Sequence, residues 1–420
     1  MSTTPVKGKL GTFAVSLTNF LDSGCIVAGA SGLALWADHF NLSSLTVGLL
    51  GAFSANAFGS AIGALIGGHL ADKFGRKFIM TYNMIIYMLG ALLVVFAVNP
   101  ALLFAGFLVL GLSVGAGVPA SWTYLSETAE TTNRAKSIGA SQFAWSLGPA
   151  IIFTLGTLFA PLGLLGNRLL FVILFVVALI AWILQRKLEE SASFTAEKAK
   201  QAKAPGHKRG MFKEIFAHAI NIRAIGFLVG VYLFWNLVAG AMGFFMPYVY
   251  TTCGGLTDFQ ANMLQAVLWV LTALATYFGF AKLGDKIDQK KFFFVGALMA
   301  IISWAILTFI GFGWGALWAF VIIWGISAGI GAQAFYALWA TELFAAKYRG
   351  GAQGIMFFAV RGACGIWSIV FPVLLGAVSF QVGGSIMIGF LIVSLVIGTI
   401  WAPKTQGKTL AQIEAERYGE

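Results

Sequence analysis

Two ionisable residues stand inside long apolar stretches of this 420-residue chain. Asp22 lies near the middle of the first stretch, and Arg361 follows Arg349 by about twelve residues, roughly 18 Å along a helix. An aspartate in apolar surroundings is costly to keep charged, so it is a candidate for taking up and releasing a proton. An arginine stays charged and offers a planar fork of donors. We expect Arg361 to pair with Asp22, to receive an anionic group of a ligand, or to do each in turn.

Amides recur in the other apolar stretches, and tryptophans accompany some of them. An amide has a donor and an acceptor and suits hydroxyl groups, while an indole can stack on the C–H face of a sugar ring. Packing between helices, or anchoring at a membrane interface, is an open alternative for the same residues, as a structural role is for the aspartate and the arginine. The candidate ligand-binding residues are Gln142, Arg361, Asn236, Gln333, Asn56, Trp145 and Trp235.

The sequence offers no pattern typical of an enzyme. It contains no nucleophile with a matched base and no phosphate-binding glycine loop, and its four histidines are scattered. The three cysteines, at positions 25, 253 and 364, have no metal-binding spacing. We therefore expect neither catalysis nor a metal or cofactor.

The elements that position these residues are predicted from composition and from the length of the apolar runs. With 59% hydrophobic and 10% charged residues and a mean hydropathy of +0.86, the chain is typical of a polytopic membrane protein. An all-α protein with twelve transmembrane helices in two six-helix bundles is expected. The predicted spans are 12–35, 45–70, 78–98, 101–125, 136–160, 168–186, 222–250, 260–284, 291–312, 315–341, 352–376 and 381–402.

Charge fixes the expected orientation. The net charge is +11, and all but two of the 27 Lys and Arg residues, Arg168 and Arg361, fall on one side when both termini are cytoplasmic. The positive charge is therefore a topology signal, and no nucleic-acid partner is needed to explain it. The expected units are an N-terminal bundle (1–186), a cytoplasmic linker (187–221), a C-terminal bundle (222–402) and a cytoplasmic tail (403–420).

A short charged loop and an internal repeat suggest how the two halves meet. The loop Gly68–Lys77 separates two charge-free runs, and its second-half counterpart begins Gly284-Asp285. The stretch that ends Glu127…Arg134 is matched by Glu342…Arg349. A parallel duplication of six helices is typical of a secondary transporter. Charges at helix ends on one side can hold the bundles together there. The predicted cytoplasmic gate contains Gly68, Asp72, Gly75, Arg76, Glu127, Arg134, Asp285, Glu342 and Arg349.

These motifs resemble those of the major facilitator superfamily, and within it the sugar porters. The loop resembles the superfamily signature between helices 2 and 3, and the two acid–arginine pairs resemble the sugar-porter motif after helices 4 and 10, without its usual proline. Pro403 to Leu410 resembles the family's C-terminal motif, and Glu189 to Phe194 a degraded form of its motif after helix 6. The resemblance extends over nearly the whole chain.

The resemblance implies a twelve-helix transporter that works by alternating access. It assigns proton carriage to Asp22 and sugar contact to Gln142, but the arginine that the family sets against the helix-1 acid is replaced by Phe107. We therefore expect a proton-coupled symporter of a sugar-like solute, either a polyol such as inositol or an acidic or sulfonated sugar derivative. The alternative is an exporter of drugs or organic anions by proton antiport. The expected partners are this solute, protons and the lipid bilayer of the inner membrane, and a monomer is expected.

Overall fold

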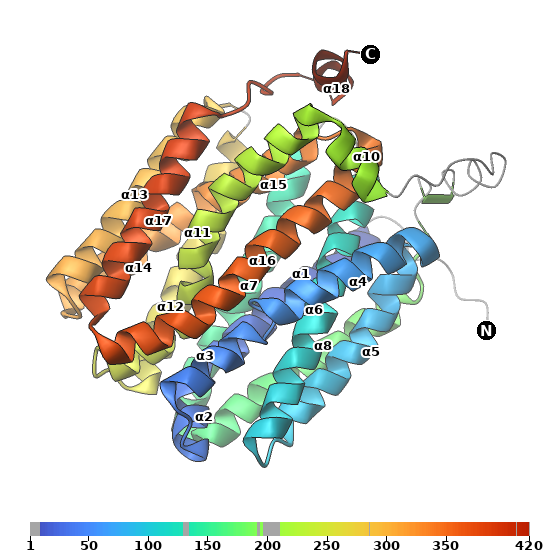
Figure 1. Cartoon of the computed structure of the whole chain (residues 1–420). Helices are drawn as coiled ribbons and strands as arrows, with labels where there is room; N and C mark the ends of the chain where they lie inside the picture. The colour runs from blue at the N-terminus through green and yellow to red at the C-terminus, as the bar shows by residue number, and fades with distance from the viewer. Residues whose placement is uncertain are drawn as a thin grey trace.

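The computed structural model is built from long helices that run across the molecule, as Figure 1 shows. It describes residues 9–128, 134–190, 194–195, 211–284, 286–408 and 410–419. No strand occurs among these residues. Eleven helical spans among these residues, some of them made of two consecutive helices, are long and apolar enough to cross a membrane. The prediction of an all-helical polytopic protein is confirmed.

The helices pack in two groups (Figure 1). The first group contains α1 (Lys9–Ser31), α2 (Leu33–Phe40), α3 (Ser44–Ala52), α4 (Phe58–Phe74), α5 (Arg76–Val95), α6 (Pro100–Thr128), α7 (Arg134–Phe159), η1 (Ala160–Leu162) and α8 (Leu164–Gln185). The second contains α10 (Met211–Ala217), α11 (Ala219–Thr252), α12 (Asp258–Leu274), η2 (Ala275–Ala281), α13 (Gln289–Ile310), α14 (Trp314–Ile330), α15 (Ala332–Glu342), α16 (Ala346–Ala377), α17 (Phe380–Ile400) and α18 (Leu410–Tyr418).

The second predicted span is not one continuous helix. α3 ends at Ala52 and α4 begins at Phe58. Between them the Ser54 hydroxyl donates to the carbonyl of Gly51 (2.7 Å) and accepts from the amide N–H of Asn56 (3.1 Å). A serine that satisfies the backbone locally competes with the helix ladder. Helix propensity and hydropathy alone do not reveal such a break.

The tenth and eighth predicted spans are also irregular. α14 and α15 divide the span 315–341 at Gly331, and α12 continues into the π-helix η2. A π-helix is rare and is frequently found at functional sites. Both irregular segments border the central cavities described below.

Glycines on α4 let it lie against α6. A Cβ atom on Gly63 would come within 2.2 Å of the Leu112 carbonyl oxygen, and one on Gly67 within 2.4 Å of the Ala116 Cα. Only glycine permits this backbone approach, as the four-residue spacing of Gly59, Gly63 and Gly67 indicates. The close contact fixes α4, and with it both the break and the charged loop.

The outer surface is apolar, as a lipid-facing surface requires. Phe309 and Ile310 at the end of α13 are 70% and 72% exposed, and Phe96 after α5 is 66% exposed. Large aromatic side chains such as Trp304 are fully buried. In a bilayer these exposed side chains contact lipid tails and not water, so the pattern fits a protein that spans a bilayer.

The most extensive contacts between the two groups involve α1, α3, α4 and α7 of the first group and their neighbours in the second. α7 packs on α12 and η2, α16 packs on α3 and α4, and α1 packs on α11. The α4–α5 turn, α10 and α18 lie at the same end of the molecule (Figure 1). The prediction that this end faces the cytoplasm stays a prediction, as do the predicted domain boundaries.

Candidate functional site

Two small adjoining cavities lie between the helix groups. They share a wall made by Trp145, Trp235, Ala239, Trp269 and Gln333. The first cavity lies among α7, α11, α12 with η2, and α14–α15, and the second among α1, the α3–α4 break, α7, α11, α12, α15 and α16. All seven predicted ligand-binding residues line one cavity or both.

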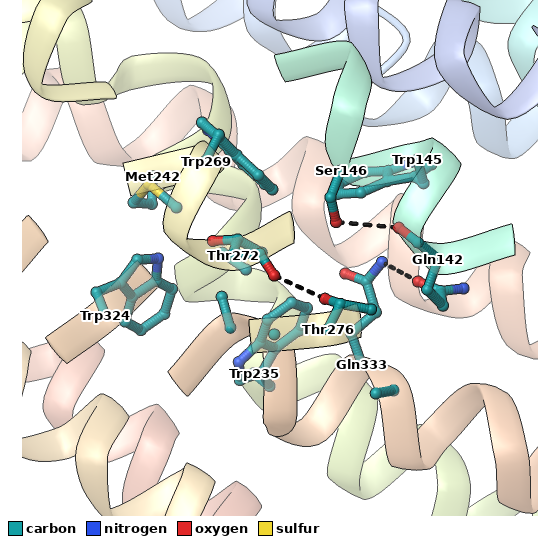
Figure 2. A pocket seen from close by; sticks show the side chains of 14 residues that line it. Gln142, Trp145, Ser146, Trp235, Met242, Trp269, Thr272, Thr276, Trp324 and Gln333 are labelled. Carbon is teal, nitrogen blue, oxygen red and sulfur yellow. Dashed lines mark hydrogen bonds between the residues drawn. The ribbon is translucent and has the colours of Figure 1, made fainter. Parts of the chain in front are cut away.

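Two of the predicted amides meet across the first cavity. The Gln333 Nε2 donates to the Gln142 Oε1 at 2.9 Å, and Figure 2 shows the two side chains facing each other. The Ser146 hydroxyl donates to the Gln142 carbonyl (3.0 Å). Gln142 comes from α7 and Gln333 from α15, so this bond joins the two helix groups. Each amide keeps unused donor and acceptor capacity toward the cavity.

Indole rings form much of the shared wall. Trp145 and Trp269 meet edge to face with 5.5 Å between ring centroids, and Trp235 lies on α11 close to both cavities. Trp324 lines the first cavity only (Figure 2). The Nε1 atoms of Trp269 and Trp324 are buried and have no hydrogen-bond partner within the described part of the chain. The cavities therefore combine apolar ring faces with free donors.

Asp22 is buried, with 2% of its surface exposed. Its Oδ2 accepts a hydrogen bond from the Trp145 Nε1 at 2.8 Å, and its Oδ1 has no hydrogen-bond partner among the described residues. Phe107, which the resemblance sets at the position of the family's arginine, packs edge to face on Phe171 and Phe244. The partner of the aspartate is therefore an indole on α7.

Arg361 joins α16 to the break between α3 and α4. Its Nη1 donates to the backbone oxygen of Asn56 at 2.9 Å and lies 3.3 Å from the Asn56 Oδ1, and the Asn56 Nδ2 donates to the carbonyl of Gly240 on α11 (3.1 Å). A break at this depth leaves backbone oxygens without helical donors, and the guanidinium supplies one. In this conformation Arg361 does not bond to Asp22. Its Nε is buried without a hydrogen-bond partner in the described part of the chain.

Asn236 lines the second cavity and is held by a thiol. The Cys364 Sγ donates to the Asn236 Oδ1 (3.1 Å), which leaves the amide nitrogen for other partners. The sequence did not single out several other cavity-lining residues, because their types are common in apolar helices: Ser23, Tyr232, Met242, Trp269, Thr272, Thr276 and Trp324.

The charged loop captures a carboxylate. Glu190 Oε1 accepts from the backbone N–H of Arg76 (3.1 Å), and its Oε2 accepts from that of Lys77 (3.1 Å). The free N–H groups at a helix N-terminus favour an anion. Gly75 has φ 104°, and a Cβ there would meet the Glu190 carboxylate. The Arg76 guanidinium also lies 5.0 Å from the ring centre of Phe194. The loop and the segment after α8 thus form one cluster.

Several residues of the predicted gate cannot be placed. Gly68 lies near the end of α4, and Glu342 is the last residue of α15 and is buried. Gly75 and Arg76 belong to the cluster described above. The side chains of Asp72, Glu127, Arg134 and Arg349 and the whole of Asp285 lie outside the described part of the structure. The gate therefore stays a prediction.

Comparison with known proteins identifies the family. The model of the Major Facilitator Superfamily matches residues 11–254. The chain is 43% identical over 413 residues to the minor myo-inositol transporter IolF of Bacillus subtilis (strain 168), which covers 97% of this chain and 94% of that protein. It is 34% identical over 184 residues to the arabinose-proton symporter of Escherichia coli (strain K12), which covers 44% and 38%. These relatives are transporters, in agreement with the expectation that the chain is not an enzyme.

The fold is also that of a solved structure. The proton:xylose symporter XylE of E. coli, bound to 6-bromo-6-deoxy-D-glucose, superposes with a TM-score of 0.78 at 20% identity and covers 97% of this chain and 98% of its own. At this identity the likeness concerns the fold alone. Together, the family match and the relative of near full length establish that the chain belongs to the Major Facilitator Superfamily.

Proposed function

We propose that this chain is a secondary transporter that carries a neutral polyol of the inositol class together with a proton by alternating access. The observation that carries the proposal is the Gln142–Gln333 hydrogen bond, which joins the two helix groups across a cavity. A solute with several hydroxyl groups can replace that bond with bonds of its own to both amides. Binding would then change the contact between the groups, which is what alternating access requires.

The lining favours a polyol over an organic anion. Trp145, Trp235 and Trp269 offer apolar faces to the C–H bonds of a ring, and the amides face the space between them. Arg361 already donates to Asn56, so its charge is partly used within the protein. The 43% identity to a myo-inositol transporter supports the same choice. An acidic or sulfonated sugar derivative is the second candidate, because the Nε of Arg361 keeps a free donor.

Proton coupling is assigned to Asp22. Its carboxyl is buried beside the cavities and has an oxygen without a hydrogen-bond partner in the described structure. A relative named as a proton symporter supports symport over the exporter alternative. We further propose that the protein works as a monomer in the inner membrane, and that the charged loop and its counterpart gate the cytoplasmic side.

The test is uptake of radiolabelled myo-inositol into proteoliposomes with and without an acidic exterior. We expect the wild type to accumulate the solute only with the pH gradient. Asp22→Asn should abolish accumulation, while counterflow exchange of labelled for unlabelled solute continues, because exchange needs no net proton movement. Loss of myo-inositol binding in the variant would refute the proton-carrier role. Gradient-driven efflux without uptake in the wild type would favour the exporter.

A further inference from the structure

Asp22 forms no ion pair within the described part of the chain. Phe107 stands where the family has an arginine, and its ring is 3% exposed among Phe171 and Phe244. Arg361 is directed to the backbone oxygen of Asn56 instead. The charge of Arg361 acts on Asp22 at a distance, so the direct contacts of the carboxylate are made by other groups.

Trp145 is the side chain that makes this contact. Its indole N–H donates to the Asp22 Oδ2 at 2.8 Å, and its backbone oxygen accepts from the Ser23 hydroxyl at 2.6 Å. Trp145 of α7 is thus bonded to α1 twice, once through its side chain and once through its backbone. A hydrogen bond to an ionised carboxylate is roughly twice as strong as one between neutral groups. Protonation of Asp22 weakens the side-chain bond and leaves the backbone bond in place.

The same indole is also part of the wall of both cavities. Trp145 packs edge to face on Trp269 from α12, and it lies one helical turn after Gln142. A rotation of the indole would change the space available to a ligand and the position of the amide that meets Gln333. Among the residues of the shared wall, Trp145 is the one whose side chain forms a hydrogen bond to Asp22 in the described structure.

We propose that Trp145 is the positioning residue that couples the charge of Asp22 to the ligand cavities, in place of an acid–arginine pair. The ionised carboxylate holds the indole against α1. The neutral carboxyl releases it toward the cavity and Trp269, where it closes on a bound polyol. The inference rests on the proposed function for the identity of the ligand, but the contact between Asp22 and Trp145 does not.

Other titratable or charged groups face Asp22 from the helices around it. They are Cys25 on α1, Tyr87 on α5, Tyr232 on α11 and Arg361 on α16. The Tyr87 hydroxyl donates to the backbone oxygen of Leu21 (2.9 Å), and the Cys25 thiol donates to that of Asp22 (3.3 Å). Neither donates to the Asp22 carboxylate, so the Trp145 bond alone links the carboxylate to a cavity wall within the described structure.

The experiment compares Trp145→Phe with Trp269→Phe. Both changes remove an indole N–H from the shared wall, but the Trp269 Nε1 has no partner in the described part of the chain. In the wild type we expect myo-inositol affinity to change roughly tenfold or more between the two charge states of Asp22, the effect of one hydrogen bond to a charged group. Trp145→Phe should reduce this change to about twofold. Trp269→Phe should lower affinity at every pH and keep the tenfold change. Trp145→Phe with the wild-type pH dependence would overturn the inference.

A second measurement needs no solute. In the infrared spectrum of the protein with Asp22 ionised, the carboxylate stretching band that Asp22→Asn removes should shift in Trp145→Phe, because the ionised carboxylate loses its donor. It should stay in place in Trp269→Phe. An unmoved band in Trp145→Phe would overturn the inference. Wild-type protein that binds no myo-inositol at any pH would instead refute the proposed function, and the band comparison would still decide the contact.

Discussion

The close approach of α4 to α6 makes a substitution at Gly63 the most informative test of the fold. An alanine there would place a Cβ atom 2.2 Å from the Leu112 carbonyl oxygen and 2.9 Å from the Leu112 Cα. Both are backbone atoms within a helix, so neither can rotate away. α4 must move from α6, and the charged loop and the α3–α4 break must move with it.

The magnitude follows from two opposing effects. Replacing glycine by alanine in a helix gains about 0.8–1 kcal/mol through propensity, and overpacking costs about 1–3 kcal/mol. Gly389→Ala on α17 is the matched control, because a Cβ there has nothing within 4 Å. The propensity gain is common to both variants and cancels in their difference. We therefore expect Gly63→Ala to be less stable than Gly389→Ala by about 1–3 kcal/mol.

The free energy of unfolding is measured in mixed micelles by monitoring tryptophan fluorescence during titration with a denaturing detergent. The difference between the two alanine variants is the quantity of interest, and the wild type provides the reference. Equal unfolding free energies for the two variants would refute the packing described for α4 and α6. A lower stability of Gly63→Ala, together with slower uptake, would show that the approach also positions the transport machinery.

Three further predictions concern the charged and polar contacts. Arg361→Gln removes the donor to the helix break and should cost about 1–3 kcal/mol of unfolding free energy; if its charge also binds ligand, uptake of an anionic sugar derivative should fall far more than that of a neutral polyol. Gly75→Ala should destabilise by about 1–2 kcal/mol because of its positive φ, and combining it with Glu190→Gln should cost less than the sum, since both disturb one contact; strict additivity would contradict the cluster. Gln333→Ala and Gln142→Ala should each weaken polyol affinity, measured by calorimetry, and the double variant should bind little worse than either single variant.

The long apolar runs were sufficient to predict the fold class, because in a bilayer the backbone must satisfy itself and length alone marks a span. Hydropathy could not reveal the break at residues 53–57, which depends on one serine hydroxyl bonding to its own segment. The spacing of the glycines on α4 was also informative, as the long apolar runs were, because it reflects a geometric requirement that no other residue type meets.

The candidate site was predictable in its members but not in its connections. Polar residues in apolar helices are rare, so Gln142, Gln333 and Asn56 stood out by type, and the structure places them at the central cavities. Their partners lie far along the chain, Gln142 and Gln333 being 191 residues apart. No local spacing encodes such a pair. The hydrogen bond between Asn56 and Gly240 likewise depends on how the two helix groups meet.

Phe107, at the place where the resemblance leads us to expect an arginine, illustrates how a missing residue can point to a different connection. A buried aspartate without a cationic partner must either lose its charge or find other donors. Here the available donor is an indole N–H, a neutral group that cannot hold the charge as firmly as a guanidinium. A weaker hold makes the indole easier to release once the carboxyl is protonated. If Trp145 also forms the wall of the cavities, protonation and ligand binding act on one side chain, and no separate ion pair has to break between them.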